Sequence, residues 1–127
     1  MKPLTREWLE KAEGDFLVAS QIMRSSRRVH DAACFHCQQT IEKYFKARLC
    51  QAGVAFPKTH DLVVLLHLVL PAEPLWKSYE PAAKRLTEYA VSFRYPGDKA
   101  TQAEAKLALK YCRSLRGEVR RSLGMKV

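Results

Sequence analysis

Apolar residues recur every three or four positions along most of the chain, which is the spacing of one face of an α-helix. The clearest segment is residues 31–53, where Asp31 is a suitable N-cap and Gly53 a suitable C-terminal cap. We therefore predict a long helix here, with the other elements packed around it. Its apolar stripe comprises Cys34, Ile41, Phe45, Leu49 and Ala52, with Cys37, Gln38, Tyr44 and Arg48 on or beside it. Its opposite face carries His36, Gln39 and Lys43.

A first helix is predicted from Thr5, as its N-cap, to about Arg24. Asp15 falls on the apolar side of this helix, which is unusual for a carboxylate. We expect it to pair with a Lys or Arg side chain or to reach water, and a polar contact near a binding cleft is the alternative. The apolar side comprises Trp8, Ala12, Phe16, Ala19 and Met23, flanked by Leu9 and Ile22.

Residues around Pro57 are predicted to form a connection, because proline biases the residue before it away from helix. A short third helix follows this connection. Thr59 or Asp61 would cap this helix. Residues 62–70 are apolar except for His67, and by pattern alone they also fit a buried strand. We predict a helix here, because the other long segments of the chain are also predicted to be helical.

The fourth helix is predicted to open around residues 78–81 and to stop at the Pro- and Gly-containing turn of residues 94–98. Thr101 and Glu104 have the spacing of a capping box and open the last helix. The connections are short, so neighbouring helices should run in alternating directions. The sequence thus predicts an all-α fold, a five-helix up-and-down bundle, as a single domain over residues 1–127.

Composition agrees with one small globular domain without a membrane span. The chain has 127 residues, of which 47% are hydrophobic, and no long apolar run occurs in it. The N-terminal residues lack the apolar core of a signal peptide. We therefore expect a cytoplasmic protein that does not contact membranes.

The four cysteines all fall within helical patterns, so we expect free thiols packed as small hydrophobic residues. Cys34 and Cys37 form a C-x-x-C motif with His36 between them. A structural zinc site needs a second ligand pair, and a thioredoxin-like site needs a preceding strand, and the sequence offers neither. We predict no metal and no other cofactor.

The net charge of +9 is concentrated at the C-terminal end. Residues 106–127 hold seven basic residues against one acidic residue. A stripe opposite the apolar face of the last helix carries Lys106, Lys110, Arg113 and Arg120. This stripe is either a solvated helix face or a patch that attracts the phosphate backbone of RNA.

Three motifs resemble those of HEPN (higher eukaryotes and prokaryotes nucleotide-binding) domains. Residues 34–49, Cys-Phe-His-Cys-Gln-Gln-Thr-Ile-Glu-Lys-Tyr-Phe-Lys-Ala-Arg-Leu, look like the second helix of the family. Lys58-Thr59-His60-Asp61-Leu62 resembles its next signature, and Arg94-Tyr95-Pro96 matches the position of its key arginine. The resemblance covers roughly residues 8–111, most of the chain.

The resemblance implies two functional classes. One is a nucleotide- or RNA-binding module that partners a minimal nucleotidyltransferase, sometimes as a toxin–antitoxin pair, and the other is a metal-independent ribonuclease. Ribonuclease members use an Arg followed within four to six residues by a His, and no His follows Arg94 in that window. Arg24 and His30 fit the string but lie in the first interhelical loop, so we interpret that match as chance. We therefore favour a non-catalytic module.

The resemblance also implies a homodimer, and a third hypothesis is a homodimeric helical scaffold without a nucleotide site. In an alternating bundle, the start of the third helix, the end of the fourth and the start of the fifth lie at the same pole. We therefore expect a nucleotide or phosphate site there. Its predicted residues are Lys58, His60, Asp61, Arg94 and Tyr95.

Overall fold

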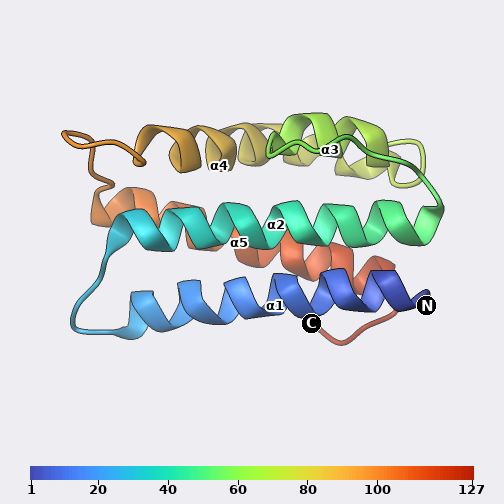
Figure 1. Ribbon diagram of the computed structural model, residues 1–127, viewed down its shortest axis with the longest axis horizontal. Helices are drawn as coiled ribbons and strands as arrows, with labels where there is room; N and C mark the ends of the chain where they lie inside the picture. The colour runs from blue at the N-terminus through green and yellow to red at the C-terminus, as the bar shows by residue number, and fades with distance from the viewer.

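The computed structural model covers residues 1–127 and contains helices but no strands (Figure 1). The predicted all-α bundle of five α-helices is confirmed. None of these helices is both long and apolar enough to cross a membrane. The elements are α1 (Pro3–Arg24), α2 (His30–Ala52), α3 (Leu62–Val69), the short 3-10 helix η1 (Pro74–Tyr79), α4 (Glu80–Ser92) and α5 (Gln102–Ser122).

The four long helices alternate in direction, whereas the short α3 runs parallel to α2 (Figure 1). The cause is the connection after Gly53, which doubles back along the bundle. Its Phe56 ring packs edge-on against Trp8, with ring centroids 6.2 Å apart. Further along, the carbonyl of His60 accepts a hydrogen bond from Gln38 Nε2 at 2.7 Å. The start of α3 therefore lies beside the middle of the bundle, and the prediction that it lies at the same pole as the end of α4 is wrong.

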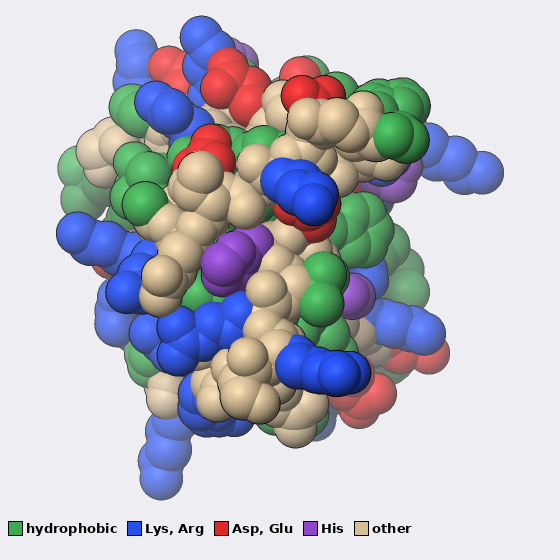
Figure 2. Space-filling model, turned by 90° about the vertical axis from the view of Figure 1, so that its left-hand side faces the viewer, with side chains coloured by type: hydrophobic (Ala, Val, Ile, Leu, Met, Phe, Trp, Pro, Cys, Tyr) green, Lys and Arg blue, Asp and Glu red, His purple; other side chains and the backbone are tan.

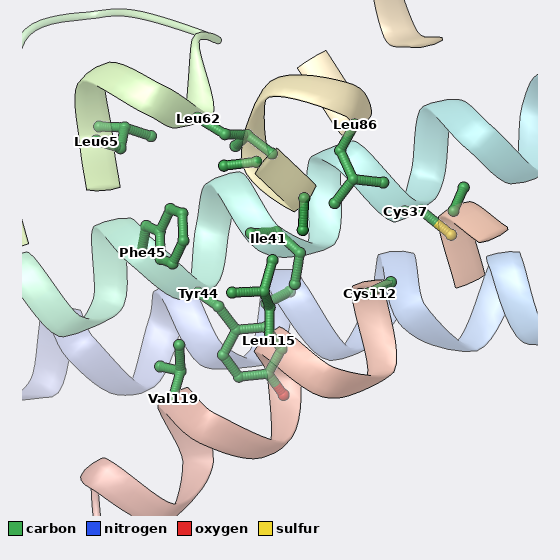
Figure 3. Close-up of a cluster of buried hydrophobic side chains, with 14 of the residues drawn as sticks. Cys37, Ile41, Tyr44, Phe45, Leu62, Leu65, Leu86, Cys112, Leu115 and Val119 are labelled. Carbon is green, nitrogen blue, oxygen red and sulfur yellow. The ribbon is translucent and has the colours of Figure 1, made fainter. Parts of the chain in front are cut away.

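Helix α2 is the centre of the fold, as its sequence predicted, and it contacts each of the other four α-helices. Ile41, Tyr44, Phe45 and Leu49 on this helix are fully buried. Figure 3 shows the first three of them between α3 and α4 on one side and α5 on the other. Truncating such a side chain to Ala costs roughly 2–5 kcal/mol of folding free energy, because a cavity remains.

The helix ends agree with prediction at three places. Gly53 adopts the left-handed conformation, with φ at 72°, and closes α2. Asp61 caps α3, since its carboxylate accepts the Val63 N–H at 2.9 Å. The capping box of Thr101 and Glu104 opens α5.

Two predicted caps are wrong. Helix α1 begins at Pro3, and Thr5 lies buried inside it with its hydroxyl 3.1 Å from Gln51 Oε1. Helix α2 begins one residue before Asp31, whose carboxylate instead accepts the Ala100 N–H at 2.7 Å. In both cases a distant residue competes successfully for the polar side chain, which local spacing does not reveal.

Asp15 has the cationic partner that its position suggested. Its carboxylate binds Lys43 Nζ and lies 2.8 Å from His36 Nδ1. The face of α2 opposite its apolar stripe therefore contacts α1, because the central helix is covered on more than one side.

Candidate functional site

A polar hollow of about 400 Å³ opens between α2, the connection before α3, and the last turns of α4. We call it the polar hollow. It brings together three of the predicted site residues, His60, Asp61 and Arg94. The other two, Lys58 and Tyr95, are exposed and do not line it. The remaining lining residues are Phe35, Gln38, Gln39, Thr87, Ala90 and Val91.

The floor of the polar hollow is fixed by hydrogen bonds between elements. Thr87 Oγ1 on α4 accepts the Leu62 N–H at 3.1 Å and so ties the start of α3 to α4. The buried Gln38 amide holds the His60 carbonyl from the α2 side. Its Oε1 accepts a hydrogen bond from Gln39 Nε2 at 2.8 Å, which leaves Gln39 Oε1 free.

A buried carboxylate, Glu42, holds the ring of His60. Its Oε1 lies 2.8 Å from His60 Nδ1, and its Oε2 accepts from Lys46 Nζ at 3.1 Å. Lys46 is itself buried, with its ammonium over the rings of Trp8 and Phe56. The His60 side chain is nevertheless 81% exposed. With Nδ1 engaged, its Nε2 is the ring nitrogen left to meet a ligand.

Arg94 contributes an uncommitted positive charge. Arg48 and Arg116, by contrast, are held by the carboxylates of Glu73 and Glu13. The exposed Arg94 guanidinium has no hydrogen-bond or ion-pair partner in the protein. A planar guanidinium offers parallel donors that match phosphate or carboxylate oxygens, so an anion is the natural occupant beside it.

A second hollow of about 270 Å³, lined mainly by hydrophobic residues, adjoins the first between α2 and α4. We call it the apolar slot. The two hollows share Phe35, Ala90 and Arg94. The other residues of the slot are Asp31, Ala32, Tyr89 and Phe93.

The end of the bundle where α1 joins α2 carries many Lys and Arg side chains around a central His (Figure 2). A further hollow of about 450 Å³ lies at that end, lined by Ser25, Ser26, Arg28, His30 and Gln102. Arg24 is not among these residues, so the Arg24–His30 string does not come together in this hollow.

The predicted basic stripe of α5 retains three of its four members. Lys106, Lys110 and Arg113 are exposed and have no ion-pair partner. Arg120 lies elsewhere, with only 13% of its side chain exposed. Its Nη1 donates to the Tyr44 hydroxyl at 3.2 Å and its Nε to the Lys126 carbonyl at 2.6 Å. The structure therefore removes Arg120 from the predicted RNA-backbone patch.

Arg120 belongs to a polar cluster centred on Glu13. Arg116 donates two hydrogen bonds to the Glu13 carboxylate, at 2.7 and 2.6 Å, and the Tyr44 hydroxyl donates a third. Burial by itself raises the pKa of Glu13, but the bonds from Arg116 and Tyr44 outweigh it and lower the pKa below its ordinary value. This cluster ties α1, α2 and α5 together.

The C-x-x-C motif lies inside the hydrophobic core. Burial raises the pKa of the Cys34 thiol to about 12. A hydrogen bond with Cys112, together with burial, raises the pKa of Cys37 far above its ordinary value. Both side chains are fully buried, so at neutral pH they are packed thiols. No group of three or more His, Cys, Asp or Glu side chains is arranged to hold a metal ion.

Comparison with known families assigns the chain to a family. The model of the HEPN domain family matches residues 5–122, nearly the whole chain. The chain belongs to the HEPN domain family. This confirms the resemblance seen in the three sequence motifs and identifies a helical module of the nucleotide-binding or ribonuclease type.

A solved structure supports the assignment of this HEPN domain. The crystal structure of TT1696 from Thermus thermophilus superimposes with a TM-score of 0.75 at 26% sequence identity. The alignment covers 92% of this chain and 96% of that protein. The search of curated proteins finds no match.

Sequence reasoning missed several residues of the site, namely Phe35, Gln38, Gln39 and Thr87. A signal for the α2 residues was present, since Phe35, Gln38, Gln39 and Glu42 have the spacing of one helix face. Thr87 carried no such signal, because its role depends on the path of the chain before α3.

Proposed function

We propose that this HEPN domain is a non-catalytic module that binds the phosphate of a nucleotide or RNA in the polar hollow. One observation carries the proposal: the unpaired Arg94 guanidinium lines the same hollow as the exposed ring of His60. Both are donors suited to phosphate oxygens, and the elements that carry them are joined by hydrogen bonds. Such a site needs little rearrangement to bind, which favours affinity.

Asp61 sets a limit on what the hollow accepts. Its carboxylate lines the hollow and is engaged at one oxygen by the Val63 N–H. A negative side chain disfavours a ligand that is highly charged throughout. The balance of charges therefore favours a single phosphate group beside Arg94 and His60.

The test is calorimetric titration of the protein with adenosine monophosphate. Arg94→Gln should weaken binding by about tenfold or more, because a charge-assisted hydrogen bond is worth roughly 1.5–3 kcal/mol. Lys84→Gln is the matched control, since Lys84 is an exposed cation on α4, the helix that precedes Arg94, and does not line the hollow. If both variants lost the same affinity, the loss would reflect the change in net charge and not a specific contact with Arg94. Absence of binding by the wild type would refute the proposal.

We further propose that the module partners a minimal nucleotidyltransferase, in the manner of a toxin–antitoxin pair. The support is membership of the HEPN family together with the missing His after Arg94. Co-expression with a minimal nucleotidyltransferase from the same genome should give a complex that survives size-exclusion chromatography. Separate elution of the two proteins at micromolar concentration would count against it.

A metal-independent ribonuclease is the second candidate, and the contact between His60 and Glu42 favours it. A carboxylate on Nδ1 orients an imidazole so that Nε2 can move a proton, which RNA cleavage requires. Arg94 in the same hollow would stabilise phosphate charge. We expect little cleavage of RNA by the purified protein. Robust cleavage that disappears in His60→Ala and falls in Glu42→Gln would establish the ribonuclease instead.

A further inference from the structure

We propose that the apolar slot holds an unpaired nucleobase whose phosphate lies in the polar hollow, so that the site selects single-stranded over double-stranded RNA. The inference rests on the proposed phosphate site and adds to it the part of the ligand that would give affinity beyond charge. It starts from the fact that the two hollows adjoin and share Phe35 and Arg94.

Aromatic rings line the apolar slot from both of its helices. Phe35 comes from α2, while Tyr89 lies on α4 and Phe93 directly follows it. The rings of Tyr89 and Phe93 lie against each other, with centroids 5.5 Å apart and planes 35° apart. Phe35 is 38% exposed, so its ring is available to a ligand. An exposed aromatic face such as that of Phe35 stacks on bases whatever their sequence, while the buried Tyr89 forms part of the wall of the slot.

Small residues keep the slot open. Ala32 on α2 and Ala90 on α4 line it, where larger side chains would fill the space between the helices. An ordinary core seam of two helices is closed by interlocking side chains. Alanine on both helices between aromatic rings therefore leaves room for a flat apolar group.

The charged side chains favour the base in the apolar slot and the phosphate in the polar hollow. Asp31 lines the slot, and its Oδ1 accepts the Ala100 N–H, so the slot carries a negative side chain and no cation besides Arg94. A phosphate is repelled there, whereas an uncharged base is not. Arg94 lines both hollows and suits the phosphate where they meet. A nucleotide joins an apolar ring to a phosphate through one sugar, which matches two adjoining hollows that share Arg94, one holding His60 and the other holding Tyr89 and Phe93.

This arrangement predicts a preference for single-stranded RNA over double-stranded RNA. In a duplex, each base is paired at its edge and stacked on both faces, so it cannot enter a slot between two helices. Proteins that stack bases on aromatic side chains accordingly bind unpaired nucleotides.

The test separates the base from the phosphate by titrating adenosine monophosphate and ribose 5-phosphate into the same variants. Phe35→Ala should weaken adenosine monophosphate about 5- to 150-fold, the loss typical of one stacked base. It should weaken ribose 5-phosphate much less, because the Phe35 ring also borders the polar hollow but donates no hydrogen bond to phosphate, whereas Arg94→Gln weakens both. Tyr95→Ala is the matched control, because Tyr95 is an exposed aromatic next to Arg94 that lines neither hollow.

Equal affinity of the wild type for both ligands would overturn the base subsite and leave the phosphate site standing. If neither ligand bound to the wild type, both the base subsite and the phosphate site would be overturned. Phe35→Leu guards against a folding artefact, since it keeps an apolar side chain and removes the ring. It should lose most of the affinity that Phe35→Ala loses, and full retention would contradict stacking. An eight-nucleotide RNA should bind more tightly single-stranded than annealed to its complement, and Phe35→Ala should reduce that preference.

Discussion

Asp61 has two roles that act in opposite directions at the polar hollow. Its carboxylate caps α3 by accepting the Val63 N–H, and its charge faces the proposed phosphate site. Asparagine caps helices about as well as aspartate, so Asp61→Asn should leave stability nearly unchanged. It should also raise affinity for adenosine monophosphate by roughly twofold to tenfold, because a repulsive charge at the surface is removed.

The measurement for Asp61→Asn is a titration at low and at high salt, beside thermal unfolding. Salt screens the repulsion, so the gain in affinity should shrink at high ionic strength. Asp98→Asn is the control, since Asp98 is exposed in the turn after α4 and outside the hollow. Weaker binding by Asp61→Asn would show that the carboxylate contacts the ligand favourably.

Glu13 is the residue at which stability should depend on pH. Its pKa is lowered in the folded protein from an ordinary value of 4.5, against the effect of burial, by hydrogen bonds from Arg116 and Tyr44. A lowered folded pKa means that the stabilisation is present above the unfolded pKa and is lost as pH falls through the folded value. Glu13→Gln should therefore lower the free energy of unfolding at pH 7, with the difference from wild type shrinking below about pH 4.

Urea unfolding at pH 7 and pH 3 checks the Glu13 prediction. The expected loss at pH 7 is about 1–2 kcal/mol, in the lower part of the range for charged hydrogen bonds because the carboxylate is partly exposed. Glu10→Gln on the same helix is the control, since Glu10 is exposed and has no ion-pair partner. An equal loss at both pH values would mean that the charge of Glu13 is unimportant.

At the scale of one element, the basic stripe of α5 should attract RNA without reading its sequence. Lys106, Lys110 and Arg113 are exposed and unpaired, and spaced cations contact phosphates only. Replacing all three by Gln should weaken binding to every single-stranded RNA. It should flatten the slope of log affinity against log salt by about two, at roughly 0.7 per lost phosphate contact.

A control triple variant replaces Lys11, Lys77 and Lys84, which are exposed cations on α1, η1 and α4. It removes the same charge and should change the slope much less. Arg94→Gln should weaken the binding of mononucleotides by about tenfold or more while nearly preserving the slope. Identical slopes for the α5 variant and wild type would make the stripe a solvated helix face.

At the scale of the whole molecule, we expect a homodimer, as family membership suggests. Helix α3 is nearly all apolar, but most of its apolar side chains do not offer a dimer surface, because Leu62, Leu65, Leu66 and Val69 are buried within the bundle. Exposed apolar side chains remain on α1, where a hollow of about 750 Å³ opens beside Gly14. Leu4 and Val18 line this hollow, and Leu17 is exposed nearby.

Light scattering at micromolar concentration should give about twice the chain mass of 14.6 kDa. Val18→Arg should shift the protein toward monomer, because a charge in an apolar interface is costly. Leu75→Arg, at an exposed position on η1, should not. A wild-type particle of single-chain mass would refute the homodimer.

The sequence by itself determined the helices and much of the site chemistry. Apolar periodicity located all five α-helices, Gly53 and Asp61 marked ends that the structure confirms, and α2 was recognised as central. These features are local, since a backbone turn and a cap depend on residues a few positions apart. The motifs containing His60 and Arg94 also marked residues that share one hollow.

Only the tertiary structure decided which polar side chains face ligand and which face protein. Periodicity placed Lys43 and Arg120 opposite the apolar faces of their helices, yet Lys43 binds Asp15 and Arg120 joins the cluster around Glu13. The return of the chain after Gly53 likewise depends on contacts between distant residues, such as Phe56 on Trp8. A polar side chain at the edge of a helix face can be solvated by water or can contact a partner on another helix. That choice depends on the free energy of a contact that exists only after the helices have packed.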